Sequence, residues 1–197
     1  MLLSHDHRAG ESRLAPALGL VTDIVGYGCR NTRDQQQAQE RLCSVTRNVL
    51  ADLGVRSREL LFEGPWGDGM SIVLPVATDP ARALPRLLVA TASRLGCDNE
   101  RHKDQLRLRM AVGFGLVGRG PLGLVGHLIV ELARLSESVP IRKAVADHPE
   151  SHLVVLISRL LHQLVDRTDA QGLVPALERV DVVVKEYDAP AWLWVGT

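Results

Sequence analysis

The chain has 197 residues, a length that fits one domain. Its 23 Lys and Arg residues balance 23 Asp and Glu residues, which argues against a strongly basic nucleic-acid-binding protein or a polybasic membrane-surface protein. Hydrophobic residues make up 46% of the chain and charged residues 23%, values that predict a packed core and argue against disorder.

Cysteine usage and the lack of long apolar segments indicate a cytoplasmic protein that binds no membrane. Cys29, Cys43 and Cys97 are widely spaced and form no CxxC pair, so we expect reduced thiols rather than a disulfide framework or a zinc site. The first residues do not show a basic segment followed by an apolar stretch, and no run of about 18 uncharged apolar residues occurs.

The N-terminal part predicts a tail, a strand, a turn and a helix. Residues 1–15 are polar, and we expect them to form a flexible tail. The apolar run Ala17–Val25 predicts a buried strand, and Gly26–Asn31 predicts a turn. A capping-box spacing at Thr32 and a glycine at position 54 mark the two ends of the helix that follows.

A hairpin and a second helix come next. Two apolar stretches flank Gly64–Gly69, which predicts a β-hairpin with Asp68-Gly69 at its tip. Asp79 and Pro80 can start a helix. Pro85 fits poorly inside a helix, so the regular helix is alternatively expected to begin there.

The second half of the chain continues the alternation of strands and helices. The predicted elements are a strand at 106–116, a glycine-rich loop at 118–126, a helix from 128, a strand at 152–157, a helix at 159–167, and a hairpin of 180–185 and 191–195 around Tyr187–Pro190. The order β-α-ββ-α-β-α-β-α-ββ contains a ferredoxin-like βαββαβ core. We therefore expect an α+β domain at 16–197, with a mainly antiparallel sheet, helices packed on one face and a C-terminal hairpin.

Two carboxylates are candidates for site chemistry. Asp23 ends a predicted strand and Asp68 lies at a predicted hairpin tip, and these two places are neighbours in a ferredoxin-like core. Together they could hold Mg²⁺ through oxygen ligands, and the amides of the turn at 26–29 could bind phosphate oxygens. Each aspartate also has a structural explanation, because Asp68 fits an ordinary hairpin turn and Asp23 could cap the turn after it.

The motifs occur in the order and spacing of a known family. The chain resembles class III nucleotidyl cyclases, and most closely an actinobacterial group of small cyclase-like domains that end in V-K-E-x-x-A-x-W. The segments that carry the resemblance are Val21–Tyr27 (F-x-D-I-x-G-F), Gly67–Gly69 (the Gly-Asp hairpin), Leu106–Val117 (R-I-G-I-H-x-G-x-V), Gly126–Leu135 (G-D-x-V-N-x-A-A-R-L), Leu153–Ser158, and Val182–Val195 with its lysine.

The resemblance implies a two-metal Mg²⁺ or Mn²⁺ site, a nucleoside triphosphate substrate and a homodimer. It assigns metal binding to Asp23, Ile24 and Asp68, phosphate binding to Gly26, Tyr27, Gly28, Cys29 and Lys185, and a catalytic role to Arg134, which would neutralise charge at the reacting phosphorus across the dimer interface.

Three departures from the family pattern leave two functions open. Val130 replaces the asparagine that orients the ribose, Gly64 replaces the purine-selecting lysine, and Gly123 replaces its acidic partner. The first function is a cyclase that forms a 3′,5′-cyclic nucleotide and pyrophosphate, with the base unassigned and a pyrimidine among the candidates. The alternative is a catalytically inactive nucleotide-binding or dimerisation module of a signalling or defence system.

Overall fold

The computed structural model describes residues 14–121, 123–166 and 177–196. The expected tail at 1–15 falls almost entirely outside these ranges, and the first strand begins at Ala15, two residues before its expected start. No helix in the described ranges is long and apolar enough to span a membrane.

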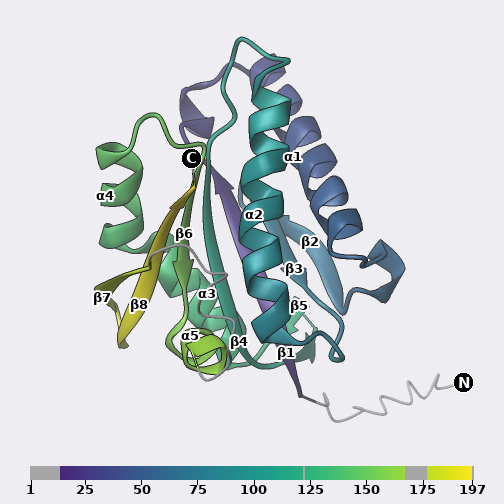
Figure 1. Ribbon diagram of the computed structural model, residues 1–197, viewed down its shortest axis with the longest axis vertical. Helices are drawn as coiled ribbons and strands as arrows, with labels where there is room; N and C mark the ends of the chain where they lie inside the picture. Colours follow the sequence, from purple (N-terminus) through teal and green to yellow (C-terminus); the bar gives the residue numbers. More distant parts are fainter. Residues whose placement is uncertain (1–13, 122, 167–176, 197) are drawn as a thin grey trace, which may run out of the picture.

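The described residues form an α+β domain around one mixed sheet, which confirms the predicted fold class (Figure 1). The strand order is β2-β3-β1-β4-β6-β8-β7, and β5 pairs with β4 outside this path. The strands are β1 (Ala15–Ile24), β2 (Phe62–Trp66), β3 (Gly69–Val73), β4 (Leu108–Gly120), β5 (Gly123–Val125), β6 (Leu153–Ile157), β7 (Glu178–Val184) and β8 (Tyr187–Gly196).

All strand pairs are antiparallel within the described ranges except β4 with β6, which are parallel. A parallel pair needs a crossover connection, and two consecutive helices supply it: α3 (His127–Glu137) and α4 (Val139–Asp147). β1 is central and pairs with β4 from Ala15↔Val117 to Ile24↔Leu108. This register fixes which residues lie opposite Asp23.

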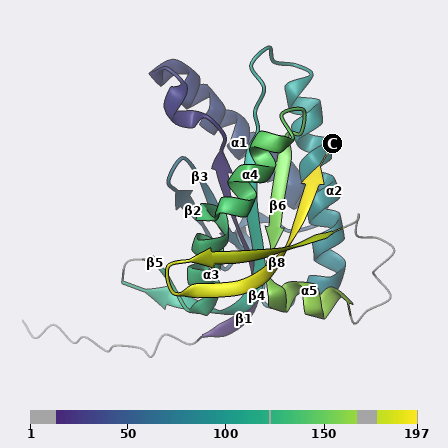
Figure 2. The same ribbon diagram turned by 90° about the vertical axis from the view of Figure 1, so that its left-hand side faces the viewer.

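Helices cover both faces of the sheet, so the expectation of helices on one face was wrong. α1 (Thr32–Asp52) and α2 (Pro80–Asn99) lie side by side on one face with α5 (Arg159–Asp166), and α3 and α4 cover the other (Figures 1 and 2). The reason is visible in β1, where Leu18 packs with the first group and Val21 with the second. A strand buried on both faces requires a layer on each side.

The two long helices begin where polar residues cap them. The N-cap of α1 is Asn31, whose side chain accepts a hydrogen bond from the Asp34 amide at 3.0 Å, so the predicted capping role of Thr32 was wrong. α2 begins at Pro80 after the Asp79 cap and continues through Pro85, which was the alternative start. Several leucines of α2 are fully buried, and this packing maintains the helix despite the hydrogen bond that Pro85 cannot donate.

One segment expected to be a loop forms a hairpin, and the predicted C-terminal hairpin turns at a different place. The glycine-rich segment at 118–126 continues β4 and returns as β5, with Gly120 opposite Gly123. In the C-terminal hairpin the turn lies at Lys185-Glu186, not at Tyr187–Pro190, because Val184 pairs with Tyr187. Lys185 adopts φ 54, the conformation that a two-residue hairpin turn demands.

Candidate functional site

The structure brings the β2–β3 hairpin tip against the end of β1. A Cβ atom on Gly69 would lie 1.8 Å from the Thr22 carbonyl oxygen and 3.0 Å from the Asp23 Cα, so only glycine fits at this contact. The Thr22 hydroxyl also accepts a hydrogen bond from the Met70 amide at 3.1 Å. Asp68 directly precedes Gly69, so its main chain lies one residue from this contact with the end of β1.

Asp23 forms an ion pair with Arg109, the residue opposite it on β4. The two side chains are 20% and 23% exposed, so the pair is partly shielded from water. Burial lowers the pKa of Arg109, and the nearby charge of Arg142 lowers it further. The Arg109 Nε atom is buried and has no hydrogen-bond partner in the described residues. Sequence reasoning did not connect Arg109 with Asp23, because only the β1–β4 register shows that they are opposite.

The oxygen atoms of Asp23, Asp68 and the Ile24 main chain are ligands that suit a hard divalent cation. Burial raises the pKa of Asp68, so its negative charge is poorly solvated and a cation beside it would relieve that cost. The Ile24 side chain is a hydrocarbon, which leaves its main-chain oxygen as its one possible ligand. The described residues contain no group of three or more His, Cys, Asp or Glu side chains able to hold a metal. Two carboxylates with a carbonyl are a typical partial set for Mg²⁺ when substrate phosphates supply the rest.

The predicted phosphate-binding turn forms a short 3₁₀ helix, η1 (Tyr27–Cys29), after Gly26, whose φ is 71. The Cys29 amide donates to the Gly26 oxygen at 3.1 Å, so this donor is used inside the turn. The Tyr27 hydroxyl accepts a hydrogen bond from Gln39 of α1 at 2.8 Å. The turn is therefore fixed between β1 and α1, next to Asp23 in the chain.

Arg134 and Lys185 lie in a second cluster, where α3 meets the turn of the β7–β8 hairpin (Figure 2). Arg134 forms an ion pair with Glu186 at 2.6 Å, and Lys185 lies 3.9 Å from Glu137. In the described part of the chain, no hydrogen bond or ion pair connects this cluster with Asp23 or Asp68. One copy of the chain thus presents the predicted site residues as two separate groups.

The structure shows the surroundings of the three residues that depart from the family pattern. The Val130 side chain is 46% exposed on α3, where it can form no hydrogen bond to a ribose. A Cβ atom on Gly64 would lie 2.7 Å from the Phe62 ring, so this packing excludes a lysine unless Phe62 moves. Gly123 has φ 120 in the β4–β5 turn, a conformation that disfavours an acidic side chain.

A cavity of about 270 Å³ lies between α1 and the β2–β3 hairpin. Gln39 and Cys43 line it from α1, and Gly64, Gly67 and Gly69 line it from the hairpin. Its wall is mostly apolar, with the Gln39 amide as a polar group, and it adjoins the hairpin tip that carries Asp68. The sequence analysis missed Gln39 and Cys43, because a helical periodicity does not show what a helix faces.

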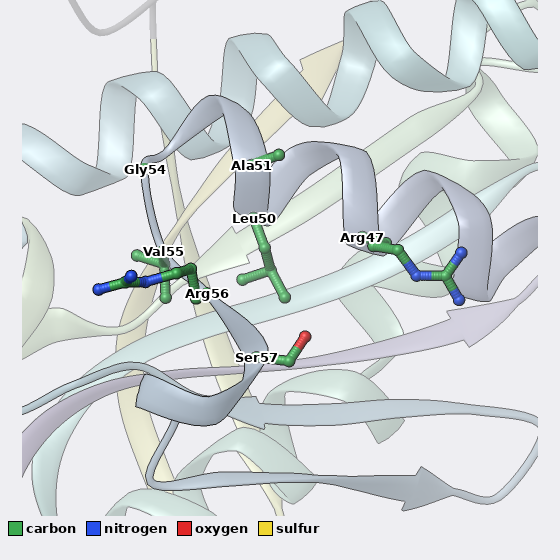
Figure 3. Close-up of a pocket in the computed structure, with 7 residues that line it drawn as sticks. All are labelled: Arg47, Leu50, Ala51, Gly54, Val55, Arg56 and Ser57. Carbon is green, nitrogen blue, oxygen red and sulfur yellow. The ribbon is translucent and has the colours of Figure 1, made fainter.

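A larger cavity of about 550 Å³ lies at the other end of α1 (Figure 3). Arg47 and Arg56 point in opposite directions there, and Arg56 is held by Glu59 with an Nε–Oε1 distance of 2.9 Å. α1 has 21 residues and is therefore about 30 Å long, which separates this cavity from Asp23. We do not include it in the candidate site.

Comparison of whole structures gives a consistent set of similar folds. The chain is similar to the adenylyl cyclase CyaB from P. aeruginosa, with 13% identity, a TM-score of 0.64, and coverage of 95% of this chain and 96% of that chain. It is similar to the guanylyl cyclase Cya2, with 13% identity, a TM-score of 0.61, and coverage of 93% and 92%. It is also similar to an adenylate/guanylate cyclase/hydrolase from Silicibacter pomeroyi, with 18% identity, a TM-score of 0.62, and coverage of 93% and 98%.

These similarities concern the fold. The sequence matches neither a protein-family profile nor a curated protein. Over about 93% of its length the chain has the fold of class III adenylyl and guanylyl cyclase catalytic domains. The element order that the sequence predicts matches the observed order except for β5 and the division of the helix after it into α3 and α4.

Proposed function

We propose that the chain binds a divalent metal–nucleoside triphosphate between Asp23, Asp68 and the turn at 26–29, and that it converts this ligand into a 3′,5′-cyclic nucleotide and pyrophosphate. The observation that carries the proposal is the contact of Gly69 with the Thr22–Asp23 main chain. This contact brings the main chain of the hairpin tip, which carries Asp68, against the end of β1, which carries Asp23, and it supports a shared metal site on a fold that adenylyl and guanylyl cyclases also have.

Each group has a defined task in this proposal. Asp23 and Asp68 hold the metal together with the Ile24 carbonyl, and a metal bound there would activate the ribose 3′-hydroxyl and bind the triphosphate. Gly26 and the η1 turn contact phosphate oxygens. The cavity beside the hairpin holds the base, where the mostly apolar wall provides contact area and little base-edge recognition.

The second cluster completes the site in a dimer. Among the described residues, no hydrogen bond or ion pair joins Arg134 or Lys185 to the aspartates, so the two cations would serve a site whose metal residues belong to another copy. Arg134 would then neutralise the charge that develops at the reacting phosphorus, and Lys185 would contact the phosphates. One of the similar structures is a guanylyl cyclase domain described as a non-canonical dimer.

An inactive nucleotide-binding module is the second candidate. Val130 favours it, because an exposed valine replaces the polar group that would orient the ribose. Without that group the triphosphate can bind, but its 3′-hydroxyl is not held in line with the phosphorus. This candidate retains the metal–triphosphate site and lacks turnover.

The deciding experiment combines binding and turnover. The purified chain is incubated with Mn²⁺ and each of the four ribonucleoside triphosphates, cyclic products are sought by mass spectrometry, and binding is measured by calorimetry. Asp68→Asn should abolish metal-dependent binding, and the exposed Asp181→Asn should not. A cyclic product establishes the cyclase, and binding without product establishes the inactive module. If the wild type binds no triphosphate, the proposed site is wrong and a pure dimerisation module remains.

A further inference from the structure

The two residues of the β7–β8 turn and the first residue of β8 contact three residues of α3 that are spaced three apart. Lys185 lies 3.9 Å from Glu137, Glu186 pairs with Arg134, and the Tyr187 hydroxyl donates a hydrogen bond to Glu131 at 3.1 Å. The spacing places residues 131, 134 and 137 along one face of the helix. We call these six residues the clasp.

The central contact of the clasp occupies Arg134. Its Nε and a terminal nitrogen donate to the same Glu186 carboxylate oxygen, at 3.1 and 2.6 Å. Arg134 is 17% exposed, whereas Glu186 is 65% exposed. Most of the arginine side chain is covered by the protein, whereas the exposed glutamate can leave toward solvent without disturbing the core.

The clasp uses the cations that the proposed function assigns to phosphate. A carboxylate and a phosphate group compete for the same guanidinium donors. Glu186, which pairs with Arg134, directly follows Lys185 in the turn, and Lys185 is the other cation that the proposed function assigns to phosphate. The turn thus contains Lys185, a predicted phosphate ligand, and Glu186, whose carboxylate binds the Arg134 guanidinium that a phosphate would bind.

We infer that Glu186 is an internal competitor that holds Arg134 in the free chain and is displaced by a phosphate group of the bound triphosphate, an inference that rests on the proposed function. Glu186 is then a specificity-determining residue: an anion must interact with Arg134 more strongly than the carboxylate does. A triphosphate meets this condition better than a monoanion, because it presents more charge and more acceptor oxygens.

The test compares Glu186→Gln with Glu178→Gln. Both substitutions remove one negative charge, but Glu178 is exposed at the opposite end of β7, about 20 Å along the strand from the turn. Binding of Mg²⁺–inorganic triphosphate is measured by calorimetry at about 0.15 M salt, where the screening length is about 8 Å. Because an exposed ion pair is weak, Glu186→Gln should tighten binding about threefold to fivefold and Glu178→Gln should change it little.

A second readout follows Arg134 directly. Its Nε–Hε signal in NMR spectra is assigned by its loss in Arg134→Lys. The signal should shift in Glu186→Gln, should stay in place in Glu178→Gln, and should shift in the wild type when triphosphate is added.

Three results would overturn the inference, and they separate it from the proposed function. If wild type binds triphosphate but the two glutamine variants bind it equally well, Glu186 does not compete and the proposed function stands. If the Arg134 signal is the same in wild type and Glu186→Gln, the ion pair does not form in solution. If no variant binds triphosphate, the proposed function fails and the inference fails with it.

Discussion

Asp23→Asn should lower the stability of the fold and Asp68→Asn should not, although each removes one carboxylate charge from the candidate site. Asp23 neutralises Arg109, and its replacement leaves a partly buried guanidinium without a counter-charge. Asp68 has a raised pKa because burial disfavours its charged form. At neutral pH its ionised form therefore destabilises the folded state, and asparagine removes that cost.

The burial of the pair determines the magnitude for Asp23. Breaking a fully buried ion pair costs about 3–5 kcal/mol, and an exposed pair contributes about 0–1 kcal/mol. With side chains 20% and 23% exposed, we place the cost of Asp23→Asn near the middle, at about 2 kcal/mol. For a chain of this length that corresponds to a decrease in Tm of about 4–8 °C. For Asp68→Asn we expect an unchanged or slightly higher Tm.

The assay is thermal and urea unfolding in the presence of EDTA, so that no metal contributes. The double variant Asp23→Asn/Arg109→Met is the matched control, because it removes both partners and should recover part of the stability lost in the single variant. A Tm within about 1 °C of wild type for Asp23→Asn would refute the ion pair as a stabilising contact. A clear loss of stability in Asp68→Asn would instead show that Asp68 shapes the turn.

Four further outcomes test other parts of the structure. Gly69→Ala should lower the free energy of unfolding by about 3 kcal/mol or more, measured in urea, because its Cβ would clash with the Thr22 oxygen. Burial raises the pKa of Glu131. The free energy of unfolding of wild type, relative to that of Glu131→Gln, should therefore increase as the pH falls from about 7 toward the ordinary glutamate pKa. If the difference between the two free energies does not change with pH, this expectation is wrong. Competition binding should give affinities for ATP and GTP that differ by less than about tenfold, because Gly64 and Gly123 present no side chain to a base edge. A preference of about a hundredfold would show that other residues select the base. Light scattering at micromolar concentration should show a dimer when nucleotide and metal are present, and a strict monomer would make shared-site catalysis untenable.

Local sequence patterns predicted most of the elements and the order in which they occur. The mostly apolar run of β1 predicted a buried strand, and the Gly-Asp-Gly segment predicted a hairpin tip. Their place in the βαββαβ order was enough to predict that Asp23 and Asp68 are neighbours. The first two inferences depend on residues close together in the chain, whose backbone preferences are largely local, and the third depends on the order of the elements.

Only the tertiary structure decided what the charged groups contact. Asp23 and Arg109 are 86 residues apart, and Arg134 and Glu186 are 52 residues apart. A shift of the β1–β4 register by one residue would move Arg109 to the other face of the sheet, and a different turn in the last hairpin would move Glu186 away from α3. Strand register and turn position follow from packing across the whole core, including helices on both faces of the sheet. The sequence therefore determined which charged residues are candidates for the site. Tertiary packing determined that Asp23 and Arg134, two of these candidates, already form ion pairs within the chain.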